Sequence, residues 1–358
     1  MKKILLTIVA LSCAALVSCG KSGAENGQET KSEMQTKVEE FASFKLTTDM
    51  SKLTDKEKEL VGIFLDIAEI MDDLFWLQSY GNKADMDTIA DQYAKEFAMI
   101  NYGPWERLNA MKPFVAGFGE KPLGAGFYPK DMTEEEFNAL QNEDKNSLYT
   151  VLRRDEQGKL IVKWYREEYA EQIGKVCGLL DKAIALAEDA GLKKYLQERK
   201  KAFETDDYFA SDMAWMDMKQ SRLDFVVGPI ENYEDRLFGR KAAYEAFVLV
   251  KDEEESAKLA KFTAMLPELQ KGLPCDEKFK QEVPGTESDL NVYDAIYYAG
   301  DCNSGSKTIA INLPNDERVQ LAKGARRLQL KNAMQAKFDK ILQPIANNVM
   351  SKEQLANV

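Results

Sequence analysis

Apolar side chains recur every three or four positions in the first part of the chain, which predicts amphipathic helices there. The clearest helix follows Thr54 and Glu57, a capping-box pair, and runs to about Ser79. A second helix is predicted over about 86–101, and a short one follows the cap at 133–136. Further helices are predicted over 166–190, ended by Gly191, and over 192–203.

The pattern changes to short β-branched and aromatic runs in the second half of the chain. Residues 149–154 and 160–164 flank a turn and predict a β-hairpin, and strand-length runs occupy 225–227, 244–250, 292–298 and 308–313. Residues 253–269 are helical in pattern, and a long helix is predicted from Asp316 to about Gln343, where Pro344 should kink or end it. Helices, then strands, then a helix indicate an α+β fold.

The amino terminus has the pattern of an export signal. Two lysines precede an apolar run over residues 4–17, which is too short for a permanent membrane span. Leu16-Val17-Ser18-Cys19 then matches a bacterial lipobox, so we expect residues 1–18 to be removed and Cys19 to carry the lipid. Residues 19–40 are polar and predict a flexible tether. The expected protein is exported and lipid-anchored to the cell envelope, periplasmic or at the cell surface; the alternative is an ordinary secretory signal with a chance cysteine.

Composition excludes several classes of chemistry. The formal net charge of −12 argues against nucleic acid as a partner. The chain contains no histidine, which excludes histidine-based triads and His-Glu-x-x-His zinc binding within it. Cys177, Cys275 and Cys302 form no Cys-x-x-Cys pair; a Cys275–Cys302 disulfide is possible, although free buried thiols are favoured.

Two segments carry candidate binding residues. In an extended segment Glu231 and Tyr233 would project from one face, where a carboxylate and a phenol could hold an ammonium group. Asn312 and Asn315 flank Pro314 at the end of a predicted strand. The alternative for both segments is ordinary turn formation.

Three stretches resemble the dipeptidyl peptidase III family of zinc metallopeptidases, in particular its Bacteroides-type branch. They are IENYEDRLFGRKAAYEAF from residue 230, YYAGDCNSGSKTIAINLPNDERV from residue 297 and GARRLQLKNAMQAKFDKIL from residue 324. The resemblance implies a two-lobed exopeptidase in which a strand-rich, small β-barrel-like lobe binds peptides by strand addition and a helical lobe carries Zn²⁺. It also implies substrate-binding positions, namely Glu231 and Tyr233 at the peptide amino terminus, Glu245 near that amine, and Asn312 and Asn315 on the peptide. Asn232 and Ala310 depart from the residues usual in the family.

The same resemblance implies how the chain is divided. We expect a mainly helical region over 41–215, a strand-rich substrate-binding region over 216–316, and the start of a helical zinc-binding lobe over 317–358. The family's zinc motif would follow that long helix, so the chain reads as an amino-terminal fragment of a peptidase, inactive alone and with small peptides as its partners. The alternatives are a complete, non-catalytic peptide-binding lipoprotein and a purely structural helical lipoprotein.

Overall fold

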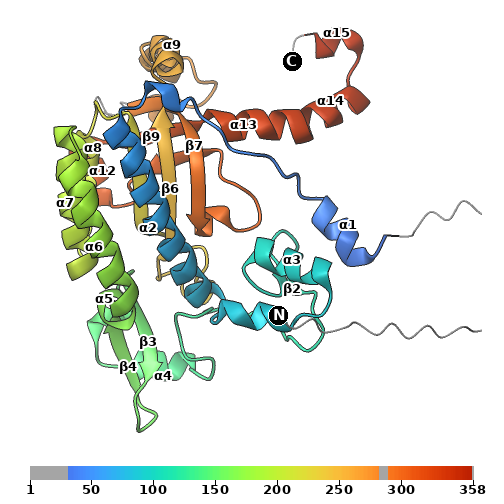
Figure 1. The fold of residues 1–358 in the computed structure, drawn as a ribbon, viewed down its shortest axis with the longest axis vertical. Coiled ribbons are helices and arrows are strands. Elements are labelled where there is room, and N and C mark those ends of the chain that lie inside the picture. The colour runs from blue at the N-terminus through green and yellow to red at the C-terminus, as the bar shows by residue number, and fades with distance from the viewer. Residues whose placement is uncertain (1–30, 282–288, 357–358) are drawn as a thin grey trace, which may run out of the picture.

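A computed structural model describes residues 31–281 and 289–356 and shows an α+β fold built on a curled five-stranded sheet (Figure 1). The strand order is β5-β6-β7-β9-β8, and every neighbouring pair is antiparallel except β7 with β9. The strands of this sheet are β5 (Leu223–Glu231), β6 (Ala243–Lys251), β7 (Asp289–Gly300), β8 (Ala310–Leu313) and β9 (Arg326–Leu330). Two small sheets lie apart from it, made of β1 (Trp105–Glu106) with β2 (Lys112–Pro113) and β3 (Thr150–Arg154) with β4 (Leu160–Trp164).

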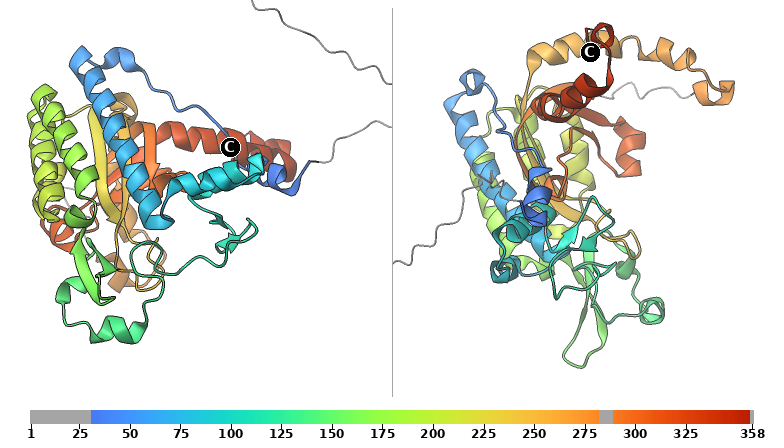
Figure 2. Two further views of the ribbon diagram at one scale, coloured as in Figure 1. Left: turned by 60° about the horizontal axis from the view of Figure 1, so that its bottom comes forward. Right: turned by 90° about the vertical axis from the view of Figure 1, so that its right-hand side faces the viewer.

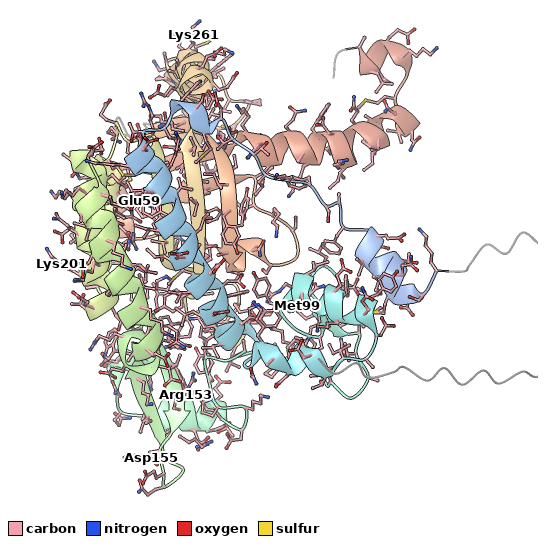
Figure 3. All side chains as sticks on the ribbon, viewed as in Figure 1. Glu59, Met99, Arg153, Asp155, Lys201 and Lys261 are labelled. Carbon is pink, nitrogen blue, oxygen red and sulfur yellow. The ribbon has the colours of Figure 1, made fainter. Side chains whose placement is uncertain are left out.

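Several α-helices precede β5 in the chain, and one of them, α2, covers a face of the sheet (Figures 1 and 2). They are α1 (Glu33–Glu39), α2 (Asp55–Ser79), α3 (Gln92–Asn101), α4 (Glu134–Ala139), α5 (Tyr165–Glu168), α6 (Ala170–Leu186), α7 (Ala190–Thr205) and α8 (Phe209–Asp217). Helix α2 packs directly on β6 and β7, and its Phe64 stacks on Phe225 of β5 with ring centroids 4.3 Å apart. Charged side chains such as Glu59 and Lys201 point outward (Figure 3). The buried apolar core therefore lies between α2 and the sheet.

Most of the predicted elements are confirmed. Thr54 and Glu57 form the predicted capping box of α2, the 149–164 hairpin is present, and all four predicted strand runs lie in the sheet. Two helix boundaries were wrong: residues 83–88 form a 3₁₀ turn before α3, and the break after α6 comes at 187–189. There Asp189 caps α7 by accepting the Leu192 N–H, so Gly191 lies in the first turn of α7 and ends no helix.

The predicted long helix from Asp316 was also wrong. The chain instead forms α12 (Glu317–Lys323), turns at Gly324 with φ 77°, and enters β9. Arg326, Leu328 and Leu330 are buried in alternation with more exposed neighbours, which is a strand period hidden among residues that favour helices. The sheet therefore extends beyond residue 316, into the segment expected to begin a helical lobe.

The remaining helices lie after β6 and after β9. They are α9 (Glu253–Thr263), α10 (Leu266–Lys271), α11 (Glu277–Lys280), α13 (Lys331–Lys337), α14 (Gln343–Val349) and α15 (Lys352–Leu355). A π-helical turn over Phe338–Leu342 joins α13 to α14, and Pro344 lies in the first turn of α14, so the helix continues past this proline. No helix in the described part of the chain is long and apolar enough to cross a membrane.

Candidate functional site

Three carboxylates meet where β5, β6 and β7 end at one side of the sheet. Glu231 is the last residue of β5, Glu245 lies on β6, and Asp301 follows directly after β7. The backbone of Gly300 makes this meeting possible, since it has φ 72° and pairs with Glu245. A Cβ on Gly300 would lie 2.2 Å from the Tyr244 carbonyl oxygen, so any other residue would push Asp301 away from Glu245.

Burial and neighbouring carboxylates perturb the protonation of Glu245 and Asp301. Burial, followed by the charges of Asp301 and Glu231, raises the pKa of Glu245 well above its usual range. Burial, followed by the charge of Glu234, raises the pKa of Asp301 to about 7. Asp301 is therefore close to half ionised at neutral pH, and Glu245 is shifted toward its protonated form. A cation that enters between these groups would favour their charged forms.

A buried cluster of Arg107, Lys121 and Glu234 lies next to these carboxylates. Glu234 is 2% exposed and contacts Arg107 Nη1 at 2.7 Å and Lys121 Nζ at 2.5 Å. Burial alone would raise the pKa of Glu234, but the charges of Lys121 and Arg107 outweigh it and hold that pKa below its usual range. Lys121 also donates to the Ser79 carbonyl at 2.8 Å, which ties the cluster to the end of α2. These residues fix the loop that follows Glu231.

Glu231 and Tyr233 do not share a strand face as predicted. Strand β5 ends at Glu231, and the next residues form a turn in which Asn232 donates to the Gly239 carbonyl at 2.5 Å. Tyr233 is 76% exposed in this turn. The premise of an extended segment was wrong, because the buried Glu234 requires the chain to turn inward immediately after Asn232.

Asn312 and Asn315 lie on the opposite edge of the curled sheet. Asn312 is exposed on β8, which pairs only with β9 among the described strands. Asn315 follows β8, and its Nδ2 donates to the Ile230 carbonyl at 3.3 Å. The curl of the sheet thus brings the end of β8 beside the end of β5, one residue from Glu231.

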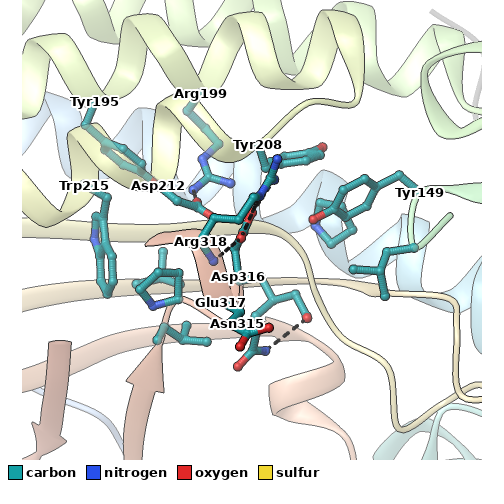
Figure 4. A pocket seen from close by; sticks show the side chains of 16 residues that line it. Tyr149, Tyr195, Arg199, Tyr208, Asp212, Trp215, Asn315, Asp316, Glu317 and Arg318 are labelled. Atoms are coloured by element: carbon teal, nitrogen blue, oxygen red, sulfur yellow. Dashed lines mark hydrogen bonds and ion pairs between the residues drawn. The ribbon is translucent and has the colours of Figure 1, made fainter. Parts of the chain in front are cut away.

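A cavity of about 370 Å³ opens at this junction (Figure 4). It is lined by the ends of β5 and β8, by α7 and α8, and by the loop before β3. At its base Arg199 donates to Asp212 at 2.6 Å, and both side chains are largely buried. The junction therefore combines a carboxylate cluster, an exposed strand edge and a partly open cavity.

The sequence contained only weak signals for several of these residues. Asp301 lies in one of the stretches that resemble the family but was not named as a site residue, and a glycine-aspartate pair at the end of a long strand run was the available signal. The Arg107, Lys121 and Glu234 cluster joins distant segments and had no local signal.

Cys19 lies outside the described residues, and Cys177, Cys275 and Cys302 are free thiols, so the possible Cys275–Cys302 disulfide is not formed.

The residues of this chain do not fit a zinc site. The sequence has no histidine, and the described residues include no group of three or more Cys, Asp or Glu side chains placed to hold a metal ion. Oxygen ligands alone suit harder cations than zinc.

Comparisons with known proteins agree with this fold. The model of peptidase family M49 matches residues 125–354. DPP III from Caldithrix abyssi superposes with a TM-score of 0.84 at 42% identity, over 89% of this chain and 63% of its own. DPP III from Corallococcus sp. strain EGB superposes with a TM-score of 0.81 at 36% identity, over 91% and 63%.

Two curated relatives extend the comparison. Nudix hydrolase 3 of Arabidopsis thaliana is 30% identical over 92% of this chain and 50% of its own length, and dipeptidyl peptidase 3 of Homo sapiens is 28% identical over 47% and 22%. The chain thus spans half or less of the length of these two relatives.

Proposed function

The chain belongs to peptidase family M49, and from this premise we propose that it forms the peptide-binding part of a dipeptidyl-peptidase-like exopeptidase. In this proposal the junction of β5, β6, β7 and β8 holds a peptide by its free amino end. The observation that carries the proposal is the meeting of Glu231, Glu245 and Asp301 beside Asn315, because these residues come from four separate segments.

The carboxylates suit an ammonium group. A peptide amine is cationic below its pKa of about 8 and carries three N–H donors. Glu231 and Asp301 supply negative charge, and Asn315 supplies a carbonyl acceptor. Placing the cation among half-buried carboxylates gives charge-assisted hydrogen bonds, which are stronger than neutral ones. An exopeptidase needs such a fixed point, because it must measure a set distance from the amine to the scissile bond.

The edge of β8 suits the peptide backbone. Ile311 and Leu313 are buried, whereas Ala310 and Asn312 are exposed, and β9 occupies only one edge of the strand. An extended peptide could pair with the other edge by strand addition. Asn312 would then lie beside the peptide, as the family resemblance implies.

Hydrolysis is proposed for the whole protein, with zinc as its metal by family membership. This chain supplies binding, orientation and the charge at the amino end, and it is proposed to cleave no peptide alone. A non-catalytic peptide-binding protein is the second candidate, since the residues of this chain offer no histidine for a zinc site. Both candidates share the same amine site.

Calorimetry on the purified chain tests the proposal. A tetrapeptide with a free amine should bind, and the same peptide acetylated at its amine should bind at least tenfold more weakly, because loss of a charged contact typically costs 2 kcal/mol or more. Glu231→Gln should remove most of this difference, whereas Glu255→Gln, a control on α9, should keep it. Equal binding of both peptides to the unchanged chain would refute the proposal.

A further inference from the structure

The turn that carries Asp301 is tied to the helices on both sides of this residue. Gly300, just before Asp301, donates its N–H to Asp72 Oδ1 of α2 at 3.1 Å. Asn303, two residues after Asp301, donates its side-chain amide to the Tyr102 hydroxyl at 2.8 Å. The Tyr102 hydroxyl in turn donates to the same Asp72 oxygen. One tyrosine and one aspartate therefore join both ends of the turn in a single chain of hydrogen bonds.

Tyr102 reaches this position through an unusual backbone conformation. It ends α3 with φ 51° and ψ 48°, in the left-handed region that a bulky residue rarely adopts and that glycine or asparagine usually fills at a helix end. Tyr102 is 3% exposed, and its ring packs on Phe75 and Trp76 of α2 with ring centroids 4.9 and 5.0 Å apart. Such conformations persist where the surrounding structure holds them, and they gather at functional sites. Here the conformation places the hydroxyl between Asp72 and Asn303.

The end of α3 makes further contacts beside the carboxylates. The Ile100 carbonyl accepts the Gly305 N–H at 2.9 Å. The Asn101 carbonyl accepts from Arg107 Nε at 2.6 Å, and Asn101 Oδ1 accepts the Arg107 backbone N–H at 2.9 Å. Arg107 is one of the two cations that contact Glu234. The end of α3 therefore holds both the turn after β7 and the ion cluster next to it.

We propose that Asp72 and Tyr102 are positioning residues of the amine site, which keep the Asp301 carboxyl beside Glu245 and ready to accept the peptide amine. This inference rests on the proposed function and extends the site to α2 and α3, in the mainly helical region. Asp72 acts on Asp301 through the backbone, because its contact is with the Gly300 N–H. Loss of either side chain leaves the turn attached at fewer points, so Asp301 is held less firmly against the bound amine.

Removal of one hydroxyl tests the proposal with little change in packing. Tyr102→Phe keeps the buried ring but leaves the Asn303 amide without its acceptor. In calorimetry it should weaken binding of a free-amine tetrapeptide about fivefold, because a hydrogen bond that holds Asp301 is lost. Binding of the same peptide acetylated at its amine should stay unchanged, since that peptide has no ammonium group for Asp301 to accept.

Tyr80→Phe is the matched control. Tyr80 packs on Trp76, as Tyr102 does, and its hydroxyl also donates to an aspartate, Asp85, at 3.3 Å. That bond stays within the segment after α2 and does not involve the turn after β7. Tyr80→Phe should therefore leave the affinities of both peptides unchanged.

Two variants of Asp72 separate its position from its charge. Asp72→Ala removes the acceptor of the Gly300 N–H and should weaken binding of the free-amine peptide about tenfold. Asp72→Asn keeps a side-chain oxygen that can accept this N–H, although it removes the charge. It should restore most of the affinity that Asp72→Ala loses.

The pH profile distinguishes positioning from a general effect on stability. Asp301 lies among the charged groups of Glu231, Glu234, Glu245, Arg107 and Lys121, and the Asp72 variants alter none of them. In the unchanged chain, ionisation of Asp301 between pH 6 and pH 7.5 should strengthen binding of the free-amine peptide. This rise should be much smaller in Asp72→Ala and should be kept in Asp72→Asn, whereas a mere loss of stability would not change the rise in the folded protein.

The outcomes separate this inference from the proposed function. Binding to the unchanged chain that ignores acetylation of the amine overturns the proposed function and this inference with it. Amine-dependent binding that Tyr102→Phe does not weaken overturns only the positioning role, and so does an equal loss for free-amine and acetylated peptides. If Asp72→Ala does not fold, the comparison of Tyr102→Phe with Tyr80→Phe decides the question.

Discussion

Removing one partner of the buried ion pair between Arg326 and Asp224 should cost several kcal/mol, because the other charge is left buried without compensation. The two side chains are 3% and 1% exposed, with Arg326 Nη2 2.9 Å from Asp224 Oδ2. Arg326 also donates to the Trp215 carbonyl at 3.0 Å, and its guanidinium lies 4.3 Å from the Trp215 ring centroid. Arg326→Met keeps an extended, apolar side chain but leaves Asp224 buried without its cation.

Breaking a buried pair from one side typically costs about 3–5 kcal/mol. Arg326→Met should therefore lower the free energy of unfolding in urea by about that amount, a large fraction of the about 5–15 kcal/mol of a typical domain. Arg327→Met is the matched control, since this neighbour on β9 is exposed and should cost about 0.5 kcal/mol or less. Adding Asp224→Asn to Arg326→Met should restore part of the loss. The reasoning is refuted if the two arginine variants lose equal stability.

Three further predictions concern the site and the anchor. The pKa of Asp301 is raised to about 7, so this carboxyl is mostly protonated at pH 6. Affinity for a free-amine peptide should therefore rise roughly fivefold from pH 6 to pH 7.5 and fall above about pH 8, where the peptide amine loses its proton. Calorimetry across this range should show that the rise disappears in Asp301→Asn. Purified residues 19–358 should hold no stoichiometric zinc and release no dipeptide; one tightly bound zinc per chain in metal analysis would contradict this. Cys19→Ser should move the protein from the membrane fraction to the soluble fraction, and an unmodified, soluble wild-type protein would contradict the proposed lipid anchor.

The sequence predicted elements well where local pattern and burial agree. Helix α2 carries both its cap and its apolar stripe in consecutive residues, and β6 is a mostly apolar run buried on both faces. Strand β9 was missed because Leu328, Gln329 and Leu330 favour helix locally. These residues form a strand because β9 pairs with β7 and β8, and such pairing between distant segments overrides the local preference for helix.

The candidate site was predictable only in part, for a related reason. Glu231 and Asn315 were candidates from the sequence pattern and Glu245 from the family resemblance, and the structure brings them to one junction. Asp301 joins them through the close approach of Gly300 to β6, which no local pattern reveals. Tyr233 turned outward because the buried Glu234 fixes the chain beside it.

A crystal structure of the chain with a free-amine tetrapeptide tests the central claim most directly. We predict the peptide amine within hydrogen-bond distance of Glu231 and Asn315, with the peptide backbone paired along the open edge of β8. A peptide bound with its amino end away from Glu231, or bound away from β8, would contradict the proposed amine site.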